Sequence, residues 1–217
     1  MAILSTVRQQ VVEEFLGDIA PLAAQIGSTE GLAALSAGAS GETYRVTDLP
    51  SLRAFLREYQ SRILIALELP AIWRAYELAS RCETQELIEL DRQLADRALL
   101  QSFATASQRL GKMQLKRLRP LRDQRIVQRY LHAVQAGQAH AWHTLVYGLI
   151  LSLYSLPLRQ GLVSYALQTT RGFVWSAAET LELTDEQCAE LAHEINGGLP
   201  DAVNRLLGDS SPRLLMD

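Results

Sequence analysis

Apolar residues return at every third or fourth position along most of this chain of 217 residues, and this spacing constrains the fold more than any other feature. Between residues 52 and 63 they fall at Leu52, Phe55, Leu56, Tyr59 and Ile63, on one face of a helix. No segment alternates apolar and polar residues over six positions before a hairpin turn, so no strand is predicted. The pattern predicts an all-α fold, a single-domain bundle of about eight to ten helices over residues 1–217.

Capping signals and prolines divide the periodic segments. Asp48 or Thr47 is suited to cap an amphipathic helix that follows, and Pro70 is expected to interrupt it. Residues 86–109 read as one further helix, and residues 158–182 as helices packed on several sides. Thr184 and Gln187 form a capping box, because each side chain can satisfy the other residue's backbone amide. The helix after this box should stop at the two glycines at 197 and 198.

Composition excludes several classes of protein. The apolar run at residues 145–158 is shorter than the ~20 residues that a membrane span needs, so it predicts a buried central helix. A net charge of −3 gives no global attraction to nucleic acid or to anionic lipid. Cys82 and Cys188 are too few for a disulfide framework, and the N-terminus lacks a secretory signal. We therefore expect a cytoplasmic protein.

Motifs for catalysis are missing from the sequence. It holds no GxxxxGK[ST] or GxGxxG loop for a nucleotide and no GxSxG nucleophile, so neither enzymatic activity nor a cofactor is expected. His140 and His143 could supply one side of a metal site, but structural sites usually have four ligands, so we favour two polar residues at the exposed start of a helix. A rival interpretation is a diverged small-molecule-binding or enzymatic domain whose pocket is lined by Tyr147, Tyr154, Tyr165, Phe173 and Trp175, although aromatics there are more often core.

Two segments stand out by composition. Residues 27–44 are rich in glycine and serine, which predicts a flexible loop, and residues 209–217 form a short tail. Residues 112–129 carry seven basic side chains against one acid, Asp123. A nucleic-acid surface would need aromatic platforms, which are missing here until Tyr130. A solvated face or an acidic protein partner is the favoured interpretation.

Several motifs, in order, resemble the urease accessory protein F (UreF) family over residues 42–207. Glu68, Leu69 and Pro70 precede a helix with Trp73 and Tyr76, as the family's D-L-P element precedes an aromatic-rich helix. Residues 87–94 match its L-x-x-L-D-x-x-L pattern, and residues 107–111 match its S-x-x-x-G helix. The apolar segment at residues 142–148 and the junction at residues 176–187 are similar in place. The family's glycine-rich N-terminal loop and charged C-terminal tail, where it meets its partners, differ here.

The resemblance implies a function. It implies an all-helical, homodimeric, non-catalytic chaperone that helps nickel insertion into urease. Its partners would be a UreD/UreH-type accessory protein, the GTPase UreG and the urease apoprotein. The residues implied in partner binding are Glu42, Tyr44, Ser107 and Gly111.

Overall fold

A computed structural model describes residues 46–208 of the chain; residues 1–45 and 209–217, and the side chains of Ser176, Glu179 and Thr180, are not described. Helices account for the regular structure of the described part, which confirms the all-α class. In chain order they are α4 (Leu49–Tyr59), η1 (Gln60–Glu68), α5 (Leu69–Ser80), α6 (Thr84–Ala95), η2 (Ala98–Leu100), α7 (Gln101–Arg117), α8 (Arg125–Gln135), α9 (His143–Leu153), α10 (Leu158–Thr180), α11 (Asp185–Asn196) and α12 (Leu199–Gly208).

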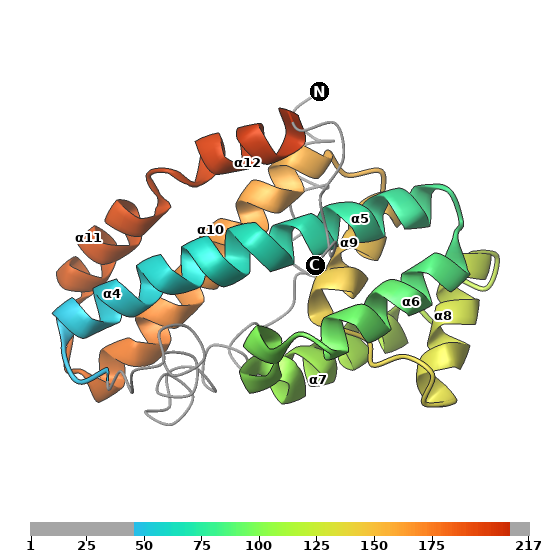
Figure 1. Cartoon of the computed structure of the whole chain (residues 1–217), viewed down its shortest axis with the longest axis horizontal. Helices are drawn as coiled ribbons and strands as arrows, with labels where there is room; N and C mark the ends of the chain where they lie inside the picture. Colours follow the sequence, from blue (N-terminus) through green and yellow to red (C-terminus); the bar gives the residue numbers. More distant parts are fainter. Residues whose placement is uncertain (1–45, 209–217) are drawn as a thin grey trace.

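Helix α9 is the centre of the molecule. Every residue from His143 to Leu151 is buried, because α5, α7 and α10 all pack against this one helix (Figure 1). A helix that is apolar on all sides must be enclosed in this way. Gly148 lets α5 approach closely: a Cβ at this position would lie 2.4 Å from the backbone oxygen of Ile72. The predicted buried central helix is therefore present, over a shorter range than residues 145–158.

A single rod crosses the molecule from residue 49 to residue 80 (Figure 1). The expected interruption at Pro70 is wrong, since η1 is a π-helix that runs into α5 without a break. The N–H of Leu69 donates to the carbonyl of Leu64, five residues earlier. A proline ring clashes with the carbonyl four residues earlier in an α-helix, and the wider π turn just before Pro70 moves that carbonyl away.

Other boundaries also differ from the predictions, so the division into eight to ten helices is slightly off. The expected helix at residues 86–109 is broken between α6 and α7 by the turn that precedes η2. The expected helices at residues 158–182 are one continuous helix, α10. The capping box is confirmed: the N–H of Gln187 donates to Thr184 Oγ1 at 3.2 Å, and the N–H of Thr184 donates to Gln187 Oε1 at 2.9 Å.

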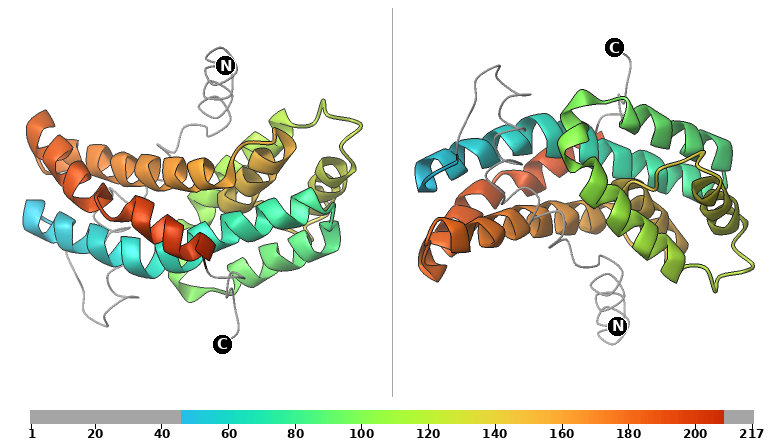
Figure 2. Two further views of the ribbon diagram at one scale, coloured as in Figure 1. Left: turned by 90° about the horizontal axis from the view of Figure 1, so that it is seen from above. Right: turned by 90° about the horizontal axis from the view of Figure 1, so that it is seen from below.

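Different helices pack together at the two ends of this elongated molecule (Figure 2). At one end α11 packs on α10 and α4, and Glu194 accepts from Arg53 at 2.9 Å and from Arg57 at 2.6 Å. At the other end α6 packs on α8, and α8 also contacts α7. Within residues 46–208, no helix combines the length and the apolar content that crossing a membrane requires.

Candidate functional site

A buried carboxylate, that of Asp91 on α6, organises the segment that leads into α9. Its Oδ1 accepts the N–H of His140, and its Oδ2 accepts the N–H of Ala141 at 2.9 Å and that of Trp142 at 3.4 Å. The Tyr130 hydroxyl on α8 donates to the same Oδ2 at 2.6 Å. Ala141 has a φ of 60°, a region that a residue with a Cβ seldom adopts, so this segment needs such contacts to hold it. Asp91 therefore joins α6, α8 and the start of α9.

Ser107 and Gly111 of α7 hold the other side of that segment. Ser107 is buried, and its Oγ accepts the N–H of His143 at 3.1 Å. Gly111 is buried as well, and a Cβ there would lie 2.0 Å from the backbone oxygen of Ala141. These residues are the S-x-x-x-G motif, so the motif sets how closely α7 approaches the start of α9. Their predicted role in partner binding stays a prediction, and burial restricts that role to an indirect one through the segment they position.

His143 is fully buried, which corrects the expectation that it lies at the exposed start of a helix. It lies between α7 and α10 because α9 is enclosed from its first residue. Its Nδ1 is 3.0 Å from Gln114 Oε1, an arrangement in which the ring donates and the amide oxygen accepts. Burial lowers the pKa of His143 to about 4, so the ring is neutral at neutral pH. Its Nε2 makes no hydrogen bond within the described part of the chain.

A second buried acid, Glu68, lies where η1 meets α5. The Tyr59 hydroxyl donates to Glu68 Oε2 at 2.6 Å, and the Tyr59 ring packs edge-on against Phe173 of α10, with 4.5 Å between ring centroids. Burial raises the pKa of Glu68 to about 7, although hydrogen bonding from Tyr59 and the nearby Tyr165 hydroxyl opposes the shift. The Tyr165 hydroxyl makes no hydrogen bond of good geometry among the described residues, so the Tyr59 hydroxyl is the well-placed donor to Glu68.

The cavity beside Glu68 is too small for a substrate. A cavity of about 10 Å³ lies beside Glu68, bordered also by Phe103, Ser107 and Trp142. That volume suits at most one water molecule. Over residues 46–208 the structure brings no three His, Cys, Asp or Glu side chains into a group that could hold a metal ion. The buried polar groups therefore bind parts of this chain to one another.

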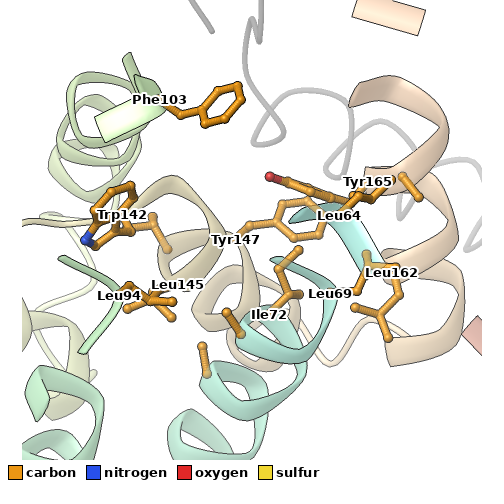
Figure 3. Packing of buried hydrophobic residues seen from close by; sticks show 14 of the residues in the cluster. Leu64, Leu69, Ile72, Leu94, Phe103, Trp142, Leu145, Tyr147, Leu162 and Tyr165 are labelled. Carbon is orange, nitrogen blue, oxygen red and sulfur yellow. The ribbon is translucent and has the colours of Figure 1, made fainter. Parts of the chain in front are cut away.

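The aromatic residues of the rival interpretation do not line one pocket. Tyr147 and Tyr165 are buried against each other, with ring centroids 5.2 Å apart (Figure 3), and the Tyr147 hydroxyl donates to the Gly161 carbonyl at 2.8 Å. Trp175 is ten residues beyond Tyr165 on the same helix, about 15 Å away. Tyr154 follows the end of α9, seven residues or roughly 10 Å beyond Tyr147. These positions favour core packing over a shared ligand site.

The surface sites predicted from the sequence divide into two groups. Glu42, Tyr44 and the loop at residues 27–44 lie outside the described residues, as does the tail at residues 209–217. The seven basic side chains of residues 112–129 are all exposed, on the last two turns of α7, the following loop and the first turns of α8. Met113, 40% exposed, lies among them. A large basic surface is therefore present at the end of the molecule that contains α8 and the end of α7.

Comparison with known protein families matches the UreF family over residues 46–195. The chain belongs to the UreF family. This is a family of urease accessory proteins, and the match covers most of the described part. No curated protein matches the chain.

The motifs by which this UreF family member resembles its relatives meet at one place. The L-x-x-L-D-x-x-L motif supplies Asp91, the S-x-x-x-G motif supplies the face of α7, and the apolar segment supplies the start of α9. They come from three helices and converge on residues 139–143, which we call the joint. Neither Asp91 nor Glu68 had an individual role that was predicted from the sequence. The sequence shows each as an acid flanked by apolar residues at helical spacing. An exposed acid on an amphipathic helix has the same pattern, so the pattern does not reveal that these two are buried.

Proposed function

We propose that this UreF family member is a cytoplasmic, non-catalytic scaffold that assists nickel insertion into urease. In this role it binds a UreD/UreH-type accessory protein and a UreG-type GTPase, and the complex acts on the urease apoprotein. The observation that carries the proposal is the family match over residues 46–195. Nickel is the cargo of the assembly rather than a resident cofactor of this chain.

The geometry supports a scaffold in two ways. The buried carboxylates and the buried imidazole are directed at backbone amides, hydroxyls and an amide side chain of the same chain. A scaffold acts by binding one state of its partners more tightly than another, which needs a fixed shape rather than reactive groups. The joint fixes the relative positions of α6, α7, α8 and α9, and with them the surfaces that these helices expose.

A reconstitution experiment tests the proposal. Urease apoprotein is expressed with a UreD/UreH-type protein and a UreG-type GTPase, with or without this chain, and the nickel content and activity of purified urease are measured. We expect both to rise when the chain is present, and the tagged chain to retain the two accessory proteins. Equal nickel content with and without the chain, together with no retained accessory protein, would reject the proposed function.

A further inference from the structure

A groove lies between α6 and α8 at the end of the molecule opposite α11. Its volume is about 410 Å³, which is large enough for a few side chains of a peptide and far larger than a single ion needs. Its walls are formed mainly by the first turns of α6 and the middle of α8. The lining includes Thr84, Gln85, Ile88, Arg129, His132 and Ala133.

The chemistry of the lining favours a negatively charged occupant with an apolar part. Arg129 and His132 are exposed basic side chains, and the groove lining contains no acidic residue. Glu83, which precedes α6, and Glu86, in the first turn of α6, do not line the groove. Ile88 and Ala133 are buried and form an apolar floor. A carboxylate beside an apolar side chain would match both parts of this surface.

Two further features of the groove, an unpaired hydroxyl and an uncapped helix start, also favour a negatively charged occupant. Thr84 is 5% exposed, and its hydroxyl has no hydrogen-bond partner within the described chain. Glu83 precedes α6 as its N-cap residue, but its side chain makes no capping hydrogen bond to the first amides of the helix. The Thr84 N–H already donates to the Cys82 carbonyl at 3.0 Å, so the first-turn amides left to attract an anion are those of Gln85 and Glu86. These groups lie beside the basic side chains contributed by α8.

We propose that this groove binds an acidic segment of a partner protein. Carboxylates of the segment meet Arg129 and the first turn of α6, and an apolar side chain of the segment covers Ile88 and Ala133. The neighbouring basic surface of residues 112–129 attracts such a partner at long range. A nucleic acid fits less well because the lining has no Phe, Tyr or Trp side chain on which a base could stack. The inference goes beyond nickel insertion and does not depend on it.

Fluorescence anisotropy with a defined probe tests the proposal. The probe is a fluorescein-labelled peptide of ten glutamates and two leucines, titrated with the full chain at low and at moderate salt. We expect binding that weakens with salt. Arg129→Glu removes the cation, and Gln85→Trp fills the groove without changing its charge. Each should lower affinity about tenfold or more.

Matched controls separate the groove from general attraction. Lys112→Glu makes the same charge change as Arg129→Glu on an exposed α7 residue outside the groove lining, and it should change affinity less than about threefold. Circular dichroism checks that each variant is folded. Bound peptide should also slow alkylation of the exposed Cys82 thiol, two residues before Thr84, while Cys188 is buried.

Each of the following results would contradict the proposal that the groove binds an acidic segment. Equal losses with Lys112→Glu and Arg129→Glu would mean diffuse attraction without a groove site. Undiminished binding by Gln85→Trp would place the peptide elsewhere. Absence of peptide binding by the wild type rejects the site and leaves the nickel-insertion proposal standing. Tighter binding of a twelve-residue thymidine oligonucleotide, lost in the same two groove variants, would assign the groove to nucleic acid instead.

Discussion

Single atoms decide the geometry at the joint, and Gly111 is the clearest case. The atom that a Cβ would meet is a backbone oxygen, that of Ala141, which cannot turn away as a flexible side chain could. Ala141 is itself held at a positive φ by the hydrogen bonds to Asp91. Relieving a clash here therefore requires α7 to move away from the joint.

We predict that Gly111→Ala lowers the free energy of unfolding by about 3 kcal/mol, near the upper end for an overpacked core, since backbone must move. Urea denaturation of the full chain measures this loss. Gly198→Ala is the matched control, because a Cβ there meets nothing within 4 Å. If both variants unfold at the same urea concentration, α7 does not approach the joint as closely as described.

Two buried titrating groups make opposite contributions to the pH dependence of stability. His143 has a pKa of about 4 in the folded chain against 6.5 ordinarily, so its contribution is present above pH 6.5 and is lost as pH falls toward 4. Glu68 has a pKa of about 7 against 4.5, so its contribution is present below pH 4.5 and is lost as pH rises toward 7. Each pKa shift corresponds to about 3 kcal/mol of stability. Between pH 4.5 and 6.5 the two contributions change with pH in opposite directions, so their pH dependences largely cancel.

Glu68→Gln should separate these two contributions. The variant keeps a side chain of the same shape without a proton to lose, so its stability relative to wild type should grow by up to about 3 kcal/mol as pH rises from 4.5 to 7. Urea denaturation at several pH values gives this difference. The exposed Glu190→Gln should show no such growth. A constant difference across the range would mean that Glu68 is ionised in the folded protein.

Elements that carry their own boundary signals were predictable from the sequence. Asp48 does cap α4, where it accepts the Ser51 N–H at 2.9 Å, and the box at Thr184 does begin α11. Boundaries that depend on distant contacts were not. Continuation of the rod through Pro70 depends on a change of helix type, and burial of His143 depends on packing by α7 and α10. The motif residues could be recognised, but their convergence required the fold.

Asp91 supports the start of α9 from outside that helix. We predict that Asp91→Asn destabilises the chain by roughly 3 kcal/mol, because in either orientation the new NH₂ group faces a backbone N–H, that of His140 or that of Ala141, which a carboxylate oxygen accepts in the wild type. Hydrogen exchange followed by mass spectrometry should show faster exchange in residues 139–146 than elsewhere. The exposed Asp96→Asn provides the control. Unchanged protection of residues 139–146 would show that the joint holds without the carboxylate.

At the scale of the whole molecule, the exposed apolar side chains are the places where a second copy would most readily bind. Trp175 of α10 is 39% exposed, and the Arg171 guanidinium lies 5.1 Å from its ring centroid. Tryptophan and arginine are both enriched at protein interfaces. The homodimer implied by the family remains a prediction, and this pair is the contact that we assign to it.

We therefore predict that the full chain sediments as a dimer at micromolar concentration and that Trp175→Ala shifts it toward monomer by about tenfold or more in dissociation constant. Sedimentation velocity measures both. Met113→Ala, which removes the similarly exposed side chain on α7, should leave the dimer unchanged. A dimer that tolerates Trp175→Ala and not Met113→Ala would move the interface to the basic end.

The π-helix η1 also bears on how such a chain can change in length. A π turn holds about one residue more than an α turn, so deleting one residue within residues 60–68 would let the rod continue as an ordinary α-helix. The two halves of the rod would keep nearly their present rotation, because the π turn and the α turn that replaces it each complete about one full turn. The cost would arise at Pro70, whose ring would then meet the carbonyl four residues earlier, as in any α-helix. The extra residue of η1 is therefore what allows the rod to contain a proline.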